Sequence, residues 1–474
     1  MDTAYWTWIY FVINWAIRLV SLVIVPQKRS SSVAQAWLLL IFIFPLGGLV
    51  LFLIFSGKGL SAKRIKRQAE FERWIASVRR TVPLNEPPLS ITIAPQAQPV
   101  ARLADRLGDM PVLGGNTIEL LDTYNNSLAR LLADIEQAQH HVHVLYYIFA
   151  NDAVGARVAN ALIRAQQRGV KCRVLADAMG SLAYLRKLLP KLRAVGIEAE
   201  AMWEPFSLDG SRIDLRNHRK IAVIDGRIGY TGSQNLVGAK YSPGIIYREL
   251  VARVTGPVVL ELQAVFLADW FFETGQRLEG PQYYPTDNLI TGDSAAQVLP
   301  SGPGYRLENN QHLFIDLLYQ ARERVVITTP YFIPSEPFLY ALQTAAARGV
   351  EVHLIVSQKA DQLLVGLAQA SYYAQLLENG VYIHRYRPKF LHAKHMSIDD
   401  RLAVIGSSNM DIRSFQLNSE ISLIVYDAEI ARRMRALEDE YCANAELLMP
   451  ERWNQRSLAA RLFEGSARLV SPLL

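Results

Sequence analysis

The stretch NHRKIAVIDGRIGYTGSQN, residues 217–235, places a histidine, a lysine and an aspartate within eight residues of a largely aliphatic run. A second stretch, LHAKHMSIDDRLAVIGSSN at residues 391–409, repeats the pattern. In both, a lysine follows the histidine after two residues and an aspartate after seven, and a glycine, a serine and an asparagine follow after 14, 15 and 17. One such match would be an ordinary coincidence, whereas five matched offsets at two places indicate an internal duplication.

The two motifs are interpreted as strands that bring polar groups to one place. Alternate residues of a strand face the same way, so each histidine projects with its lysine, and each aspartate falls where the strand turns. Gly232 and Gly406 would allow a close approach of the backbone. If two similar units face each other, the strand ends meet in one cleft. The residues expected there are His218, Lys220, Asp225, Ser233 and Asn235 from the first motif, and His392, Lys394, Asp399, Ser407 and Asn409 from the second.

This set of side chains suits a phosphodiester. The lysines and asparagines would bind its oxygens, on which charge develops during transfer, and the serines add further donors. One imidazole would attack phosphorus, and the opposite one would protonate the leaving alcohol. An attacking histidine needs an acceptor for its far nitrogen. Glu249 and Glu420, which lie 31 and 28 residues after their histidines in strand-like runs, are the candidates. The scheme requires neither a metal nor a cofactor.

Two other interpretations compete with this one. Either motif alone would fit an ordinary buried strand with a satisfied histidine, although the matched pair argues against this. His140, His141 and His143 would put two imidazoles on one strand face for a metal, but no neighbouring carboxylate or cysteine in the sequence completes such a site. Cys172 and Cys442 are too few for a disulfide framework and are expected to be buried small hydrophobic residues.

Helical and strand-like patterns alternate along the chain, and the alternation occurs twice. The segment RGVKCRVL at residues 168–175 matches RGVEVHLI at residues 348–355, and each histidine motif follows its copy at a similar distance. Strands that alternate with helices of this length predict an α/β fold with a mixed sheet covered by helices.

We therefore expect two similar units, at residues 109–278 and 305–474, packed about a pseudo-twofold axis and joined by a linker at residues 279–304. The aromatic stretches at residues 146–149 and 330–334 are assigned to the core, with a lipid tunnel as the alternative.

Two apolar segments of membrane length precede these units. Residues 4–25 contain one charge, Arg18, and residues 33–55 contain none. Each segment exceeds the roughly 20 residues that cross a bilayer core, so residues 1–60 are expected to form a transmembrane helical hairpin. Because Arg18 is charged, the first segment could instead form an amphipathic helix that lies in the plane of the membrane. The second has residues that would kink it or make it re-entrant: Pro45, Gly47 and Gly48.

Positive charge concentrates beside these segments. Lys28 and Arg29 lie between them, and the second is followed by Lys58, Lys63, Arg64, Lys66 and Arg67. The five that follow account for most of the formal net charge of +6. Short positive segments stay on the cytoplasmic side of a membrane, which predicts a multi-pass protein with a cytoplasmic catalytic part and an anionic membrane as partner. The nearly neutral remainder argues against a nucleic-acid partner.

Residues 61–108 are interpreted as this basic juxtamembrane segment followed by a linker, because five prolines lie between residues 83 and 99. The sequence predicts no oligomeric state.

The paired motifs, each followed by Gly-Ser and Asn, resemble the phospholipase D superfamily over about residues 110–450. The bacterial cardiolipin synthases are similar over nearly the whole chain, in the two membrane segments with AWLLLIFIFPLGGLV and in DLRNHRK, PSGPG, TTPYFIPS, NMDIRS and SPLL. The resemblance implies transfer of a phosphatidyl group from one phosphatidylglycerol to the terminal hydroxyl of a second, giving cardiolipin and glycerol, in the bacterial inner membrane. It also implies that the histidine, lysine and aspartate of both motifs form the catalytic set, the aspartate by supporting the strand turn.

Other functions stay open from the residues alone. A phospholipase or nuclease of the same superfamily would use water in place of the alcohol. A transferase of the same type would use another alcohol as acceptor, and a membrane scaffold would not react at all. Two intact motifs argue against a scaffold, and the membrane segments and nearly neutral body argue against a nuclease. Asp411 and Arg413, just after the second motif, would hold a glycerol head group or would pair with each other at the rim of the cleft. If they hold the head group, the alcohol lies in the second unit, so His392 is the expected proton donor and then acceptor. In-line geometry leaves the attack on phosphorus to His218.

Overall fold

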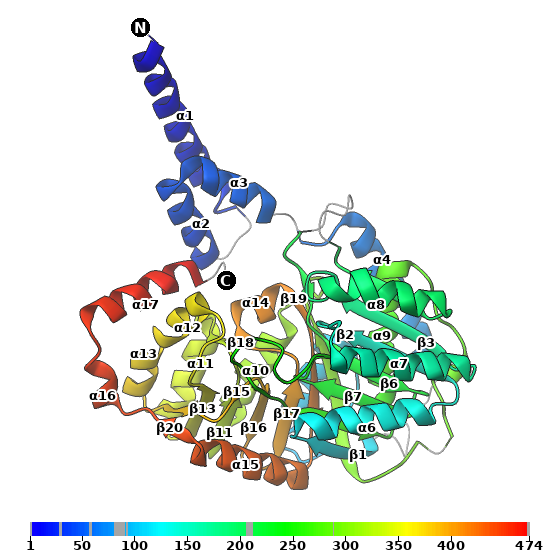
Figure 1. Cartoon of the computed structure of the whole chain (residues 1–474). Helices are drawn as coiled ribbons and strands as arrows, with labels where there is room; N and C mark the ends of the chain where they lie inside the picture. Colours follow the sequence, from blue (N-terminus) through cyan, green and yellow to red (C-terminus); the bar gives the residue numbers. More distant parts are fainter. Residues whose placement is uncertain are drawn as a thin grey trace.

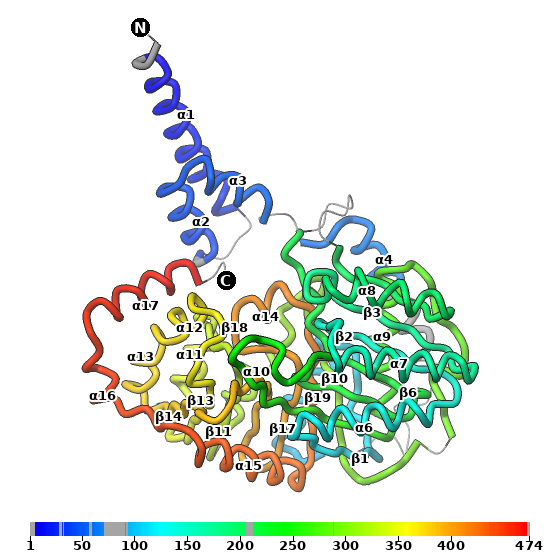
Figure 2. The backbone as a smooth tube through the Cα atoms, in the orientation of Figure 1, coloured from blue at the N-terminus to red at the C-terminus, as the bar shows by residue number. Residues whose placement is uncertain are grey.

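The computed structural model describes residues 2–27, 31–55, 59–79, 91, 93–204, 212–287 and 289–471. Some residues discussed above lie outside these ranges: Lys28, Arg29, Lys58, the last three residues of the SPLL stretch, and Pro83, Pro87 and Pro88 of the five linker prolines. A helical stalk at the N-terminus projects from an α/β body (Figure 1), and Figure 2 follows the same path of the backbone.

One sheet runs through the whole body. In the first unit its strands lie in the order β1 (Leu113–Leu121), β9 (Val251–Thr255), β7 (Ile228–Gly232), β6 (Lys220–Ile224), β2 (His141–Tyr146), β3 (Lys171–Asp177) and β4 (Glu198–Met202). In the second the order is β10 (Ser294–Ser301), β19 (Asn418–Val425), β17 (Leu402–Gly406), β16 (His395–Ile398), β11 (Arg324–Thr328), β13 (Glu351–Ser357), β14 (Tyr382–Tyr386) and β20 (Ala445–Leu447).

The two strand orders correspond, and β1 pairs antiparallel with β10 at the centre. In each unit the three strands β2–β3–β4 or β11–β13–β14 are parallel and the inner ladders are antiparallel. Two similar units with a mixed sheet about a pseudo-twofold axis are thus confirmed.

Helices cover both faces of this sheet. On one face α9 (Val259–Thr274) and α15 (Ala428–Ala443) bury a core shared by the two units. The other face is covered in the first unit by α6 (Tyr124–Gln137), α7 (Ala153–Gln167) and α8 (Leu182–Ala194), and in the second by α10 (Asn309–Gln320), α11 (Glu336–Ala347) and α13 (Tyr373–Glu378). The alternation of a strand explains the division, because Val142 and Val144 face α6–α8 while Leu145 faces the shared core.

Part of the segment expected to be a linker is a strand. Within residues 279–304, β10 is buried along its length and pairs with both β1 and β19. The prediction was wrong here because prolines and glycines surround the strand in the sequence and Pro300 lies within it, which is unusual for a central strand. Ahead of the first unit, α5 (Gln98–Gly108) also packs on the core of the second unit, through Val100 and Ala104.

The N-terminal stalk contains three helices: α1 (Asp2–Ile24), α2 (Ser31–Ile43) and α3 (Pro45–Phe55). Among the described residues, only Tyr5–Ile24 within α1 is helical, long and apolar enough to cross a membrane. The second expected span bends at Phe44 into two shorter helices, because Pro45 has no backbone N–H and Gly48 lets α3 approach the backbone of α2 at Ile41. Arg18 donates through Nε and Nη2 to the carbonyl oxygen of Phe42 in α2, which joins the two helices.

Two members of the basic cluster bind the body. They lie on α4 (Ala62–Arg79), where Arg64 forms an ion pair with Glu273 at 2.9 Å and Arg67 donates to the carbonyl oxygens of Phe272 and Glu273. Lys63 and Lys66 of the same helix are exposed. The cluster therefore fastens α4 to the first unit as well as supplying positive charge.

Candidate active site

The two histidine motifs meet at one cavity of about 500 Å³ between the units. His218 follows the short strand β5 (Arg216–Asn217), and His392 follows β15 (Phe390–Leu391). Both line the cavity, as the shared-cleft hypothesis predicted. The other predicted residues in its wall are Asn235, Glu249, Asn409, Asp411 and Arg413.

The chain crosses between the units immediately before each histidine. β5 pairs in parallel with β19 of the second unit, and the backbone N–H of His218 donates to Ser419 O at 2.8 Å. In the same way β15 pairs with β8 (Tyr247–Arg248) of the first unit, and the N–H of His392 donates to Arg248 O at 2.8 Å. Each histidine is therefore held against the strand that leads into the other unit's glutamate.

The histidine–glutamate pairs are exchanged between the units. His218 Nδ1 lies 2.9 Å from Glu420 Oε1, and His392 Nδ1 lies 2.9 Å from Glu249 Oε1. Both glutamates were predicted to orient a histidine, but each was assigned to the histidine of its own unit, and that assignment was wrong. A carboxylate acceptor at Nδ1 fixes the tautomer that leaves Nε2 as the free base.

Charge and burial keep the first imidazole neutral. Burial, with Lys220 and Lys394 nearby, holds the pKa of His218 well below its usual value. Burial raises the pKa of its partner Glu420 to about 7. The pKa of His392 is lowered by burial too, but the charge of Glu249 opposes that shift. The pKa of Glu249 itself is lowered, because His392 and Lys394 outweigh its burial.

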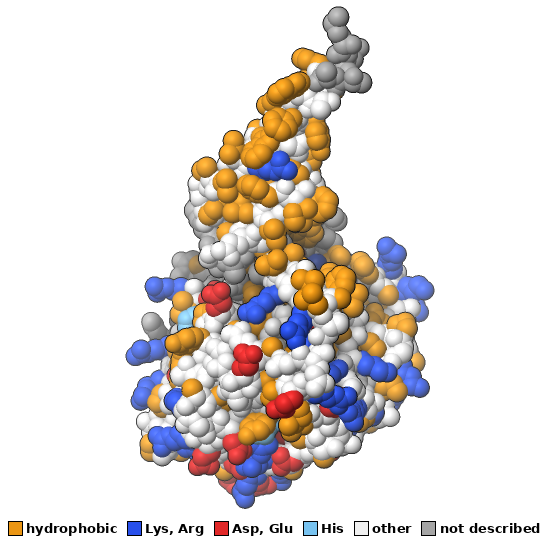
Figure 3. Space-filling model, turned by 90° about the vertical axis from the view of Figure 1, so that its left-hand side faces the viewer, with side chains coloured by type: hydrophobic (Ala, Val, Ile, Leu, Met, Phe, Trp, Pro, Cys, Tyr) orange, Lys and Arg blue, Asp and Glu red, His pale blue; other side chains and the backbone are white. Residues whose placement is uncertain are grey.

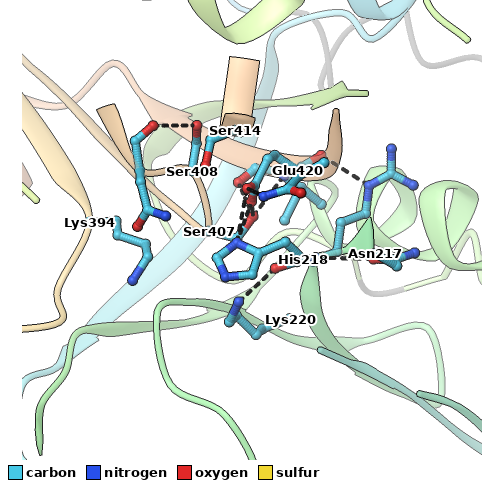
Figure 4. Close-up of polar contacts among 12 residues, drawn as sticks. Asn217, His218, Lys220, Lys394, Ser407, Ser408, Ser414 and Glu420 are labelled. Carbon is cyan, nitrogen blue, oxygen red and sulfur yellow. Dashed lines mark hydrogen bonds and ion pairs between the residues drawn. The ribbon is translucent and has the colours of Figure 1, made fainter. Parts of the chain in front are cut away.

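Two buried ammonium groups lie behind the histidines. Lys220 Nζ donates to His218 O and Lys394 Nζ donates to His392 O, each at 2.7 Å. Burial lowers the pKa of Lys220 to about 7 and that of Lys394 to about 8. In Figure 4 both amino groups lie near the His218 imidazole, while Glu420 and Ser407 lie on its other side. A phosphate in the cavity would add negative charge beside these buried amino groups and so raise their pKa values.

The predicted hydroxyl donors do not reach the cavity. Ser233 Oγ donates to Glu249 Oε2 at 2.5 Å, and Ser407 Oγ donates to Glu420 Oε2, so each serine holds a glutamate in place. Both serines are 0% exposed, which corrects the prediction that they bind the substrate directly. Asn235 does line the cavity, and its Oδ1 accepts from Ile148 N at 3.2 Å, which leaves its NH2 group for a ligand.

The two motif aspartates lie at hairpin turns, away from the cavity wall. Asp225 accepts hydrogen bonds from the backbone N–H groups of residues 139–141, and Asp399 from those of residues 322–324. Each is the first of two consecutive turn residues with positive φ, which are Asp225–Gly226 and Asp399–Asp400. This geometry agrees with the structural role that the family resemblance implied for them.

We expect Asp399→Ala to act on stability more than on catalysis. The change leaves three backbone N–H groups without their acceptor and puts alanine at a positive φ, which should cost about 2–4 kcal/mol of folding free energy. Thermal unfolding in detergent measures the loss. Asp399→Asn is the matched control, because asparagine keeps an acceptor and tolerates positive φ, so its loss should be smaller. A variant that folds normally but has no turnover would contradict this role.

Several residues of the cavity wall were not predicted as site residues. Tyr147 and Tyr331, from the stretches assigned to the core, line the cavity, whereas Tyr146 and Phe332 beside them are buried in the core. Tyr147 packs edge-on to the His218 ring at 4.9 Å between centroids. Their position in the sequence could have predicted this. Each tyrosine follows the C-terminal end of a parallel strand, β2 or β11, and α/β folds bind their ligands at these strand ends.

The arginines of the wall come from both units. Arg216 precedes the first motif, and its Nη1 donates to Ile213 O and Leu215 O. Arg413 reaches across the boundary and donates to Asp214 O at 2.5 Å. Asp411 accepts from Ser414 N and caps α14 (Ile412–Gln416).

In the histidine cluster at residues 140–143, His143 of β2 has other partners. His143 Nδ1 lies 2.8 Å from Gln263 Nε2, and its Nε2 lies 3.3 Å from the Arg173 guanidinium. A guanidinium against a ring nitrogen disfavours a cation at that nitrogen. In the described ranges, no group of three or more His, Cys, Asp or Glu residues is arranged to hold a metal ion.

Residues 131–270 and 314–440 match a family model described as "Cardiolipin synthase, PLD-like domain". The chain is 35% identical to cardiolipin synthase A of Serratia proteamaculans, in an alignment that covers 99% of this chain and 100% of the relative. It is also 35% identical to cardiolipin synthase A of Pectobacterium carotovorum, with coverage of 98% and 99%. The fold is similar to that of a phosphatidylserine synthase from Haemophilus influenzae, with a TM-score of 0.60 and 15% identity over 79% of this chain and 99% of the other.

Proposed function

This chain belongs to the family of cardiolipin synthases with PLD-like domains, and on that premise we propose that it transfers a phosphatidyl group from one phosphatidylglycerol to the terminal hydroxyl of a second, releasing glycerol. The observation that carries the proposal is the exchanged pair of His–Glu contacts around one cavity, with two buried lysines behind them. The transfer needs a nucleophile on one side of phosphorus and an acid on the other.

In the first half of the reaction, His218 Nε2 attacks phosphorus and the bond to the glycerol oxygen breaks. Glycerol takes a proton from His392 Nε2 as it leaves. Lys220 and Lys394 balance the charge on the phosphoryl oxygens. In the second half, the hydroxyl of another phosphatidylglycerol gives its proton to His392 and attacks phosphorus. The His218–phosphorus bond then breaks, so both imidazoles return to their starting states.

His218 is assigned as nucleophile because the two imidazoles differ in their surroundings. Burial and two lysines hold the pKa of His218 well below its usual value, which keeps Nε2 unprotonated. Burial lowers the pKa of His392 too, but the charge of Glu249 opposes that shift and favours a proton on His392. Arg413 and Asp411 in the cavity wall suit the hydroxyls of a glycerol head group, but Arg413 donates to Asp214 O, close before His218, and so gives no second reason.

Product analysis with purified full-length protein tests the function. Phosphatidylglycerol labelled in its head group should give cardiolipin and one labelled glycerol for each cardiolipin formed. Phosphatidic acid as the main product would show that water is the acceptor and would overturn the assignment as a transferase.

Acid quenching during turnover tests the choice of nucleophile. We expect a phosphatidyl group on the peptide that contains His218, detected by mass spectrometry, because that imidazole is the free base. His218→Ala should abolish the adduct, whereas His392→Ala should still form it slowly. An adduct confined to His392 would reverse the assignment.

The proposed site of action is the inner membrane of a bacterium. α1 supplies a helix able to cross the bilayer, and we assign α2 and α3 to a bent second segment that returns the chain to the same side. Lys63 and Lys66 beyond that segment favour a cytoplasmic body beside anionic lipid. Protease digestion of the body in inside-out vesicles, and its protection in right-side-out ones, would support this orientation.

A further inference from the structure

The C-terminal helix α17 (Leu458–Val470) turns its large apolar side chains outward. Leu458, Leu462, Phe463 and Leu469 are between 60% and 72% exposed. Three of these leucines repeat at spacings of four and seven residues and so form one stripe. The opposite, buried face carries Glu464, which pairs with Arg456, and the small Ala467. A helix on the surface of a water-soluble body has the reverse arrangement.

The stripe continues onto the neighbouring helix and is edged by positive charge. α12 (Leu363–Ala370) packs along α17 and exposes Leu363 by 78% and Leu364 by 52%. Arg461 and Arg468 lie on the flank of α17, and the Arg468 guanidinium stacks on the Tyr372 ring at 4.4 Å. Apolar side chains bordered by arginines are typical of helices that lie in the plane of a membrane surface.

The position of this surface fits the same partner. α17 lies at the end of the body from which α1 projects (Figure 1). Figure 3 shows the left-hand side of Figure 1 with the stalk at the top, and hydrophobic and basic side chains gather there where the stalk meets the body. A second copy of the chain would be a poorer partner, because a symmetric contact through α17 would bring the same arginines together.

We propose that α17 and the start of α12 lie in the head-group layer of an anionic bilayer, with Leu458, Leu462, Phe463 and Leu469 among the upper acyl carbons. Ser471, directly after α17, lines the cavity that contains His218 and His392. Resting on the proposed function, this contact holds the mouth of the cavity at the depth of the lipid phosphates. The membrane segments of the stalk anchor the chain but leave the body free to tilt, and a contact through the body itself removes that freedom.

Fluorescence quenching in vesicles tests the contact without any turnover. Phe463→Cys, in full-length protein with Cys172 and Cys442 replaced by alanine, is labelled with bimane and reconstituted into phosphatidylcholine–phosphatidylserine vesicles with spin labels on the acyl chains. The control is Arg433→Cys on α15, an exposed position on the face away from α1. We expect quenching at 463 to be roughly twofold or more above that at 433, and weaker without phosphatidylserine.

Equal quenching at the two positions would overturn the proposal. A disulfide between the unlabelled cysteines at position 463 of two copies, without quenching of the labelled protein, would overturn it as well, because it would show a dimer contact. Leu462→Glu should lower cardiolipin formation about tenfold in bilayers but leave it unchanged in detergent micelles. The matched control, Leu447→Glu on β20, changes another exposed leucine and should have no effect in either. If the wild-type protein makes no cardiolipin but position 463 is still quenched, the proposed function fails and the membrane contact stands.

Discussion

Replacing either His218 or His392 with alanine lowers phosphatidyl transfer by several orders of magnitude, about 10⁴-fold, while the protein stays folded. The two imidazoles act on the same phosphorus, one forming the bond and the other moving the proton, so neither substitutes for the other. Both line one cavity at the boundary of the units, each fixed by a backbone hydrogen bond of 2.8 Å to the opposite unit. Residual rate comes from the lysines and the binding of the phosphate.

Rates of cardiolipin formation with saturating phosphatidylglycerol measure this effect. His140→Ala is the matched control, because His140 is exposed on the loop before β2 and does not line the cavity. Its rate should equal that of the wild type. A wild-type rate in either active-site variant would show that one unit alone carries the reaction, and the shared site would then be wrong.

The repeated motifs allowed much of the fold to be predicted, since matched offsets require matched strands. Two units, a mixed sheet and a cavity between the units all follow from them, and the motif glycines are needed for the expected close approach. A side chain at Gly232 would collide with Leu250 O, and one at Gly406 with Ile421 O. The strand β10 was missed because local composition at Pro300 outweighed its pairing with two distant strands, which no local pattern reveals.

The partners of the site residues were harder to predict than the residues themselves. Counting along the chain pairs each histidine with the glutamate of its own unit, but the short ladders β5–β19 and β15–β8 join distant segments. The partners of the motif serines could not be predicted from the sequence either. Ser233 follows a glycine at φ +147° and turns its hydroxyl to Glu249, a direction that depends on the backbone rather than on the residue type.

Glu420→Gln is expected to lower the transfer rate by about 10²–10⁴-fold, through the histidine of the other unit. Glutamine is close in shape to a protonated glutamic acid, and burial already raises the pKa of Glu420 to about 7, so the fold should tolerate the change. What is lost is the carboxylate that accepts from His218 Nδ1 and makes Nε2 a stronger base. The rate of the wild type should rise with pH as Glu420 ionises, until Lys220 loses its proton, whereas Glu420→Gln should show only the fall that follows loss of the Lys220 proton.

A double-mutant cycle separates the exchanged pairing from pairing within a unit. Because Glu420 acts through His218, the variant with both His218→Ala and Glu420→Gln should be no slower than His218→Ala alone. Glu249→Gln in the His218→Ala background should lower the remaining rate further, because Glu249 orients His392 at 2.9 Å and that imidazole is still present. The opposite result, with Glu249 silent and Glu420 additive, would mean that each glutamate acts on the histidine of its own unit.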